Sequence, residues 1–385
     1  MHESADLLPF IDLAAQQEAL RGDIERAIAR VLDHGQYIMG PEVFELERQL
    51  AEYSGAKEVV SCSSGTDALW LSLLAWEVGP GDAVFLPSFT FTATAEAVAL
   101  VGAMPVLVDV RADTFNLDAS SLQAAIDLVS REGSLRPCGI IAVDLFGQPA
   151  AYDEIRALAR RAQLWVLADA AQSFGGALGN RRVGTLADAT ATSFFPSKPL
   201  GCYGDGGAIF TDDIDFAERL RSIRIHGRGS RGKYDNIRVG TNARLDTIQA
   251  AILLVKLTVF AQELEARERI AAKYNQGLNH LAQVPVMAAS VRSAWAQYTI
   301  QSDLRNKLRA ALTKRGLPSN IYYPKCLHEQ APFVDCPTSP GGLAVSEDLS
   351  HRVLSLMMHP YLTTEVQQRI LVTIQDEIQE ARTEA

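Results

Sequence analysis

Lys198 lies in the most unusual stretch of the sequence. It stands between Pro196 and Pro199, and four glycines follow it within nine residues. Proline fixes the backbone angle φ and lacks an N–H, which excludes a helix here and disfavours a central strand. Apolar stretches flank the segment at residues 190–195 and 208–210. An amine held between two buried strands is a candidate for a lowered pKa and for attack on a carbonyl carbon. The alternative is a solvated lysine in a surface loop.

A second group of polar residues lies where a short strand passes into a helix. Residues 63–66, Ser-Ser-Gly-Thr, follow the strand expected at 58–62. Backbone N–H groups at a helix N-terminus, together with the hydroxyl of Thr66, can bind a phosphate. Alternatively, Ser64 or Thr66 only caps the helix.

Two further chemical groups follow buried strands. Phe89 and Phe91 come just after the strand expected at 83–87, and either ring can stack on a planar ligand or pack in the core. Asp169 ends the apolar strand 164–168 and is followed by two alanines. A carboxylate in this position either caps a helix or pairs with a buried cation.

These features together predict pyridoxal phosphate (PLP) as a cofactor. The phosphate requires amide and hydroxyl donors, the pyridinium nitrogen requires a carboxylate, and the aldehyde requires a lysine. In open α/β sheets, ligands bind at the carboxyl ends of the strands, which is where these residues are expected.

The sequence resembles the DegT/DnrJ/EryC1/StrS family of nucleotide-sugar aminotransferases, which have the PLP-dependent transferase fold of type I. The resemblance extends over nearly the whole chain, from Phe10 to Pro360. It rests on four blocks in combination: SGTDAL at 64–69, ADAAQS at 168–173, SFFPSK at 193–198 and GTNARLD at 240–246.

The resemblance implies a role for individual residues. Lys198 bonds to the cofactor aldehyde, and Asp169 pairs with the ring nitrogen. The other implied contacts are Gln172 near the ring hydroxyl, Phe91 stacked on the ring, Gly65, Thr66 and Ser193 at the phosphate, Asn242 at the cofactor phosphate of the other subunit, and His328 at the substrate. The family's site is therefore shared across a homodimer. Cys326 stands where the family commonly has proline, and the position of Phe91 often holds a bulkier aromatic residue.

The order of expected elements predicts how these residues are positioned. Strands and helices alternate from residue 58 to residue 211, which indicates βαβ units and a sheet covered on both faces. Residues 247–274 read as one long helix or as two with little between them. We place a domain boundary inside this segment. Residues 1–255 then form a large α/β domain with a mostly parallel sheet, and residues 256–385 form a smaller α+β domain.

Composition limits the class of protein. The chain has 385 residues, a net charge of −10 and a pI of about 5.3, so we expect no binding to nucleic acid or to anionic lipid. Five widely spaced cysteines without a CxxC pair favour free thiols in a reducing cytoplasm. Residues 1–6 lack the features of a signal peptide, and the most apolar helical stretch, 250–261, is too short to cross a membrane.

Two other kinds of site are not predicted. The seven histidines have no metal-binding spacing, so no metal site is indicated. Residues 227–232 match GxGxxG, but the residues that follow do not open a helix, which argues against a dinucleotide site.

The resemblance implies an aminotransferase that takes an amino group from L-glutamate, holds it as pyridoxamine phosphate and transfers it to a keto sugar carried by a nucleotide. Residues 34–42 and 201–206 look most like enzymes that aminate the 3-keto group of a UDP-N-acetyl-hexuronate for O-antigen or related surface polysaccharides. The alternatives are a dTDP- or UDP-linked 4-keto-6-deoxy sugar, and a regulator that binds PLP without catalysis. The related sugar 3-dehydratases replace the Schiff-base lysine by histidine, and Lys198 argues against that activity.

A basic segment supports an acidic substrate. Residues 224–244 carry several arginines against a single acid, Asp235, in an acidic protein. Arg244 lies two residues from Asn242, and its planar guanidinium suits a carboxylate. We expect it to bind the carboxylate of a uronate, or that of the amino donor. The alternative is a solvated basic loop.

Overall fold

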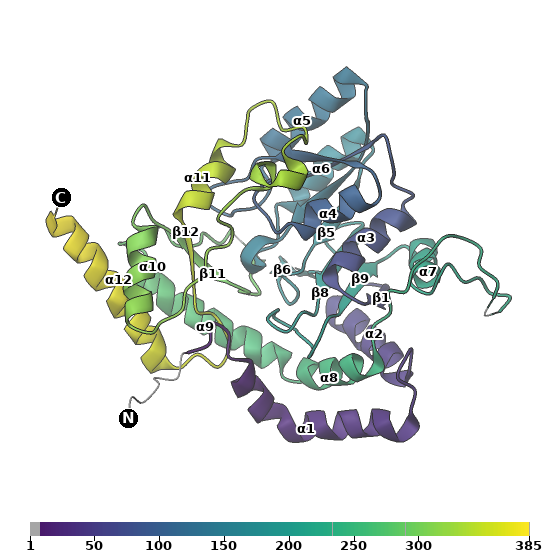
Figure 1. Cartoon of the computed structure of the whole chain (residues 1–385), viewed down its shortest axis with the longest axis horizontal. Coiled ribbons are helices and arrows are strands. Elements are labelled where there is room, and N and C mark those ends of the chain that lie inside the picture. Colours follow the sequence, from purple (N-terminus) through teal and green to yellow (C-terminus); the bar gives the residue numbers. More distant parts are fainter. Residues whose placement is uncertain (1–7, 233, 289, 385) are drawn as a thin grey trace.

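The computed structural model describes residues 8–384 except residues 233 and 289. Residues 1–6, for which no signal peptide is expected, lie outside the described residues. The chain forms a large domain around one central sheet and a smaller C-terminal domain beside it (Figure 1).

The central sheet has seven strands in the order β1-β9-β8-β5-β4-β2-β3. Strands β8, β5, β4, β2 and β3 run parallel, whereas β9 is antiparallel to both β8 and β1. The expected mostly parallel sheet is therefore confirmed. The strands are β1 (Glu58–Cys62), β2 (Asp82–Pro87), β3 (Met104–Val108), β4 (Arg136–Val143), β5 (Trp165–Asp169), β8 (Ala189–Ser193) and β9 (Gly207–Thr211).

Both faces of the sheet are buried, as successive residues of β2 show. Val84 and Leu86 pack in one core with the helices α3, α4 and α7, whereas Ala83 and Phe85 pack in a second core with α5 and α6. Side chains alternate between the faces of a strand, so a strand covered on both sides is apolar throughout. The helices are α3 (Gly65–Ala75), α4 (Ala93–Leu100), α5 (Ala119–Glu132), α6 (Tyr152–Ala162) and α7 (Ile214–Ile223).

Local sequence chemistry sets several helix ends. The carboxylate of Asp118 accepts the N–H of Ser121 at the start of α5, and Gly133, with a φ of 67°, ends it. Proline at the first position begins α2 (Pro41–Ser54). Helix α1 (Leu13–His34) lies along α8 (Thr247–Leu257) at the edge of the molecule (Figure 1).

The segment expected as one or two helices is two, α8 and α9 (Phe260–Leu278), with a bend of 62° between them. The smaller domain adds a two-stranded sheet of β11 (Tyr298–Gln301) and β12 (Val353–Leu356), with helices α10 (Arg305–Lys314), α11 (Ala344–Arg352) and α12 (Thr364–Glu384). The division at residue 255 remains a proposal.

Several short elements were not expected from the sequence. Helices α7 and α11 and strand β12 are among them, as are β6 (Ala177–Leu178), β7 (Arg181–Arg182) and β10 (Val291–Arg292), which form a second small sheet. Three 3₁₀ helices, η1 (Leu145–Gly147), η2 (Leu327–Glu329) and η3 (Ala331–Phe333), lie in connections.

Within the described part of the chain, no single helix has both the length and the apolar character to span a membrane. The bent pair α8 and α9 meets that test only when taken together.

Candidate active site

Lys198 lies in the turns that connect β8 to β9, and it is partly buried. Its N–H donates to the carbonyl oxygen of Phe195 at 2.9 Å, and the N–H of Phe194 donates to that of Gly206 at 2.8 Å, which closes the loop. Burial lowers the pKa of the Lys198 amine, and the neighbouring carboxylate of Asp169 partly opposes this. This environment favours the reactive amine over a solvated lysine in a surface loop, and the role of Lys198 stays a prediction.

Asp169 ends β5, the strand next to β8, and is 7% exposed. Thr94 Oγ1 donates to its Oδ2 at 2.8 Å, and the N–H of Ala171 donates to its Oδ1 at 3.3 Å. Burial raises the pKa of the carboxyl group, while Thr94, Ala171 and Lys198 lower it. Residues 171–175 form turns, so the alternative of a helix cap is wrong.

Gln172 and two aromatic rings lie beside this pair. The Gln172 Oε1 accepts the N–H of Phe146 at 2.7 Å, and its Nε2 donates to the hydroxyl of Tyr323 at 3.3 Å. The Tyr323 ring lies 6.1 Å from the Phe91 ring, tilted by 36°. Phe91 is 52% exposed, so much of its ring remains free to cover a planar ligand.

The expected phosphate-binding residues lie together at the start of α3. Ser64 Oγ caps the helix by accepting the N–H of Asp67 at 3.0 Å. Thr66 makes no side-chain hydrogen bond to any described residue, so its hydroxyl is available for a ligand. A Cβ atom added to Gly65 would lie 2.6 Å from the Cβ of Ser193, which shows how closely these two backbones approach.

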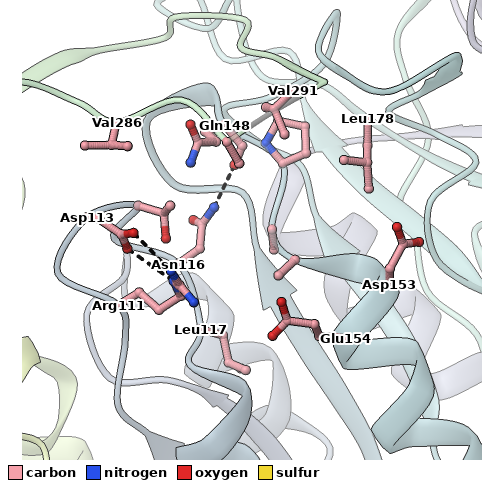
Figure 2. Close-up of a pocket in the computed structure, with 15 residues that line it drawn as sticks. Arg111, Asp113, Asn116, Leu117, Gln148, Asp153, Glu154, Leu178, Val286 and Val291 are labelled. Carbon is pink, nitrogen blue, oxygen red and sulfur yellow. Dashed lines mark hydrogen bonds and ion pairs between the residues drawn. The ribbon is translucent and has the colours of Figure 1, made fainter.

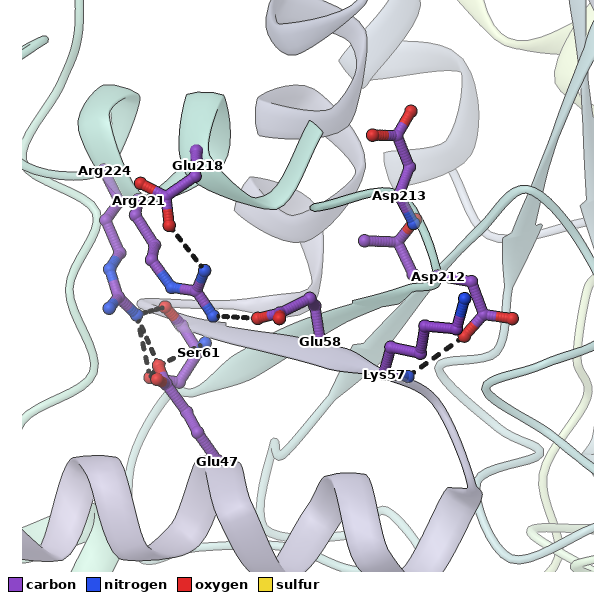
Figure 3. A network of polar contacts seen from close by, with 10 residues as sticks. Glu47, Lys57, Glu58, Ser61, Asp212, Asp213, Glu218, Arg221 and Arg224 are labelled. Carbon is purple, nitrogen blue, oxygen red and sulfur yellow. Dashed lines mark hydrogen bonds and ion pairs between the residues drawn. The ribbon is translucent and has the colours of Figure 1, made fainter. Parts of the chain in front are cut away.

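A buried ion pair joins Glu47 of α2 to Arg224, the residue that ends α7, and both side chains also bond to Ser61 of β1 (Figure 3). Arg224 Nη1 donates to Glu47 Oε1 at 2.6 Å and to the carbonyl oxygen of Ser61 at 2.7 Å. The N–H of Ser61 donates to the same Glu47 oxygen at 2.9 Å. These bonds therefore connect β1, which leads to the expected phosphate-binding residues, to the segment that follows α7.

That segment carries Asn242 and Arg244. The N–H of Ala243 donates to the Arg224 carbonyl oxygen at 3.0 Å, and Arg244 Nε donates to Asn242 Oδ1 at 2.9 Å. Among the described residues of this single chain, no contact joins either side chain to Lys198. The structure thus brings Asn242 and Arg244 to each other but not to the other expected site residues.

His328 lies at the carboxyl end of β2, held on both ring nitrogens. Nδ1 lies 2.8 Å from Ser88 Oγ, and Nε2 lies 3.2 Å from Glu347 Oε1. The N–H of Leu327 donates to the Ser88 carbonyl oxygen at 2.9 Å. These bonds fix the imidazole ring between the large domain and α11.

Asp109, just after β3, attaches α11 to the edge of the sheet. Its Oδ1 accepts from the N–H and the hydroxyl of Ser346 at 2.8 and 2.6 Å, and its Oδ2 accepts the N–H of Val345 at 3.1 Å. The carboxylate therefore caps α11, the helix that presents Glu347 to His328.

Sequence reasoning missed several residues of this arrangement. Thr94, Ser88, Tyr323 and Glu347 had not been assigned a role. For Thr94 there was a signal, a hydroxyl in an apolar helix start three residues after Phe91. For Glu347 there was none, because its partner lies 19 residues away in an irregular segment.

A separate cavity of about 380 Å³ lies among the loops that follow β3 and β4 (Figure 2). Arg111 and Asp113, which form an ion pair at 3.0 Å, line it together with Asn116 and Val286. None of the expected site residues lines this cavity, so it is not part of the candidate active site.

The grouped residues fit PLP. Among the described residues, the buried Asp169 carboxylate receives one hydroxyl and one amide donor, which suits a pyridinium. A partly buried amine with a lowered pKa suits an aldehyde. Only glycine fits at position 65 beside Ser193, and the first N–H groups of α3, which begins there, are the kind of donors that bind a phosphate.

Comparisons with known proteins agree with this geometry. The sequence profile of the DegT/DnrJ/EryC1/StrS aminotransferase family matches residues 18–375. UDP-2-acetamido-2-deoxy-3-oxo-D-glucuronate aminotransferase of Pseudomonas aeruginosa is 47% identical over 93% of this chain and 97% of its own. A crystal structure of a DegT DnrJ EryC1 StrS aminotransferase from Brucella abortus is 51% identical, with a TM-score of 0.95, over 96% of this chain and 99% of that chain. NtdA from Bacillus subtilis, solved with bound cofactor PMP, is 28% identical, with a TM-score of 0.87, over 98% of this chain and 86% of that chain.

Proposed function

The chain belongs to the DegT/DnrJ/EryC1/StrS aminotransferase family and is a PLP-dependent enzyme, and from this premise we propose that it transfers an amino group from L-glutamate to a keto group of a nucleotide-linked sugar. The observation that carries the proposal is the meeting of Lys198 and Asp169 at the carboxyl ends of β8 and β5. The alternative, a regulator that binds PLP without catalysis, would show no transfer of an amino group from glutamate to the bound cofactor.

We assign the chemical roles as follows. Bound PLP supplies an aldehyde carbon and a ring that accepts electrons. Lys198, whose pKa is lowered by burial, accepts a proton at Nζ from the donor's Cα and returns it later. Asp169 holds the proton on the ring nitrogen, and Phe91 excludes water from one face of the ring. Gly65, Thr66 and Ser193 bind the phosphate.

We propose the 3-keto group of a UDP-N-acetyl-hexuronate as the acceptor. The name of the Pseudomonas aeruginosa relative supports it, and so does the position of Arg244, whose only hydrogen bond among the described residues goes to Asn242. A guanidinium with unused donors suits the carboxylate of a uronate. The alternative substrate is a dTDP- or UDP-linked 4-keto-6-deoxy sugar, which has no such carboxylate.

The same proposal includes a homodimer, in which Asn242 and Arg244 serve the site of the other subunit and His328 binds sugar in its own. All five cysteines are free in the structure, which agrees with an enzyme of the cytoplasm that feeds surface-polysaccharide synthesis.

A panel of keto sugars tests the substrate. Purified enzyme should aminate a UDP-3-keto-uronate in preference to dTDP- and UDP-linked 4-keto-6-deoxy sugars, each generated in situ. Arg244→Ala and Arg244→Lys should lower kcat/KM for the uronate. The corresponding rise in activation free energy should be ~2–4 kcal/mol, as when one partner of a buried charge pair is truncated. The glutamate half-reaction is measured separately, because the same arginine can bind the donor's carboxylate.

Arg231→Ala is the matched control, since Arg231 lies in the same basic segment but is exposed and paired with Asp235. Preference for a neutral 4-keto-6-deoxy sugar, or normal handling of the uronate by Arg244→Ala, would show that the uronate assignment is wrong. The aminotransferase assignment does not depend on either result.

A further inference from the structure

A second buried carboxylate lies next to Asp169. Asp144 is the first residue after β4 and is fully buried. Its N–H donates to the carbonyl oxygen of Asp169 at 3.0 Å, which continues the pairing of β4 with β5 by one residue. Two carboxylate residues thus leave adjacent parallel strands at the edge where the cofactor binds.

Three donors surround the Asp144 carboxylate. The Tyr152 hydroxyl and the N–H of Ala150 donate to Oδ1 at 2.7 and 2.8 Å, and the Ser173 hydroxyl donates to Oδ2 at 2.6 Å. Among the described residues, no lysine, arginine or histidine pairs with it. A buried carboxylate without a cation is costly, so its presence requires an explanation.

The bonds to Asp144 also fix a contact of the active site. The bond from Ala150 closes the loop that begins at Asp144. Within this loop Phe146 has a φ of 60°, and its N–H points to Gln172 Oε1. The orientation of the Gln172 amide, and hence its bond to Tyr323, therefore depends on the conformation that Asp144 holds.

The outer side of the loop is fixed independently. Asn116 Oδ1 accepts the N–H of Leu145 at 2.9 Å, and its Nδ2 donates to the carbonyl oxygen of Gln148 at 2.9 Å (Figure 2). Neither of these bonds involves a titratable group, so this support of the loop does not depend on the charge of Asp144.

We infer that Asp144 is a positioning residue of the active site, which orients Gln172 and whose charge acts on the cofactor through Asp169. The inference rests on the proposed roles of Asp169 and Lys198 toward PLP. It adds a group that neither the sequence nor the comparisons assign.

The charge of Asp144 changes near neutral pH. Burial raises its pKa to about 7, against the lowering effect of the bonds from Ser173 and Tyr152, and Asp169 raises it further. The groups that face it are Tyr152 from α6, Ser173 from the turns after β5, and Asp169 from β5, which in turn faces Lys198. A negative charge here favours the protonated forms of nearby basic nitrogens.

Asp144→Asn removes this charge and can keep the contacts. The amide oxygen can accept from Tyr152 and Ala150, and the amide nitrogen can donate to the Ser173 hydroxyl. The experiment is a pH titration of the visible absorbance of bound PLP in the holoenzyme, which changes when a proton leaves the Lys198 nitrogen. Without the Asp144 charge, that proton should leave more readily, so the midpoint should fall by at least about half a pH unit.

Ser173→Ala serves as a second variant if Asp144→Asn does not fold. Loss of one donor leaves the Asp144 carboxylate neutral to a higher pH, so the midpoint should fall in the same direction by less. Ser72→Ala is the matched control. Ser72 is also fully buried and donates one hydrogen bond, at 2.7 Å to the Ala68 carbonyl oxygen, and within the described part of the chain it bonds to no carboxylate.

Infrared difference spectra give a direct measure of the Asp144 charge. The band of a protonated buried carboxyl group should disappear as the pH rises through neutrality, and it should be absent from Asp144→Asn.

The inference is overturned if the absorbance midpoint of each folded variant equals that of wild type. A chain that shows the shift but aminates no keto sugar would contradict the proposed function alone. Normal transamination with unmoved midpoints would contradict this inference alone.

Discussion

Two lysines, Lys198 and Lys256, have a pKa that is lowered by burial, so both are candidates for the bond to PLP. The pKa of Lys256 is also lowered by burial, to about 8, but its amine lies 4.3 Å above the Tyr203 ring, on the helix α8. Borohydride reduction of the holoenzyme should fix PLP on Lys198 alone, as peptide mapping would show. Lys198→Ala should bind PLP without turnover. A label on Lys256 or Lys57 would exclude the proposed chemistry.

Asp169 contributes a charge that no neutral isostere supplies. Asp169→Asn can still accept a hydrogen bond from Thr94, so the fold and cofactor binding should survive. The amide cannot hold the pyridinium proton, and we expect kcat to fall by several orders of magnitude, on the order of 10⁴-fold, as for other variants with the wrong protonation state. Steady-state kinetics with saturating PLP measure this. A loss of less than about tenfold would give Asp169 only a structural role.

Asp144 makes the stability of the protein depend on pH. Its folded pKa of about 7 lies above the value near 3.9 of an unfolded aspartate, so folding takes up a proton between these pH values. The stability that this proton uptake contributes is fully present below the unfolded pKa and is lost as the pH rises through the folded pKa of about 7. Asn cannot ionise, so the free energy of unfolding of Asp144→Asn, measured relative to wild type, should increase by about 2 kcal/mol between about pH 5.5 and pH 8.

Urea denaturation of the holoenzyme at the two pH values measures this difference. Asp303→Asn is the control, because Asp303 is 86% exposed and its substitution should have the same effect at both pH values. An Asp144→Asn advantage that does not change with pH would show that Asp144 is ionised, or neutral, over the whole range.

At the scale of the elements, the sequence predicted what local patterns determine. Strands such as β2 and β5 are mostly apolar, Asp169 ends the buried strand β5 and the lysine loop follows the buried strand β8, so fold class and cofactor followed together. Helix α11 was missed because its start depends on a cap from Asp109, more than 230 residues earlier in the chain. No window of sequence contains both partners.

Asp109 therefore joins α11 to the sheet, and its loss should affect both the stability of the helix and the position of Glu347 in its first turn. Asp109→Ala leaves the N–H groups of Val345 and Ser346 without their acceptor. We expect a loss of about 1–2 kcal/mol in the free energy of unfolding, the range for a lost N-cap. Because α11 presents Glu347 to His328, KM for the sugar should also rise while the glutamate half-reaction stays normal.

Asp118→Ala provides the comparison, since Asp118 caps α5, which carries no expected site residue. It should lower stability by a similar amount and leave KM for the sugar unchanged. If both variants alter KM equally, the effect of Asp109 is general destabilisation and not the position of His328.

At the scale of the whole molecule, the expected site divides into two groups. Lys198, Asp169 and Gln172 come together within one chain, because they follow adjacent strands of one sheet. Asn242 and Arg244 contact each other and not this group. Sequence patterns specify neighbours within a sheet, but they do not specify which surface of a second copy reaches the site, so the proposed sharing between subunits came from the family resemblance and requires its own test.

That test is complementation between two inactive variants. Lys198→Ala subunits keep Asn242, and Asn242→Ala subunits keep Lys198, so each lacks a different part of a shared site. In a heterodimer of the two, one site would combine an intact Lys198 from one subunit with an intact Asn242 from the other. Random mixing of equal amounts after unfolding should restore about a quarter of wild-type activity, since half of the dimers are mixed and each has one intact site.

Each variant refolded alone is the control and should stay inactive. If differently tagged subunits prove that mixed dimers form and activity does not return, Asn242 acts in the site of its own chain, and Arg244, its hydrogen-bond partner, must be reassigned to that site as well.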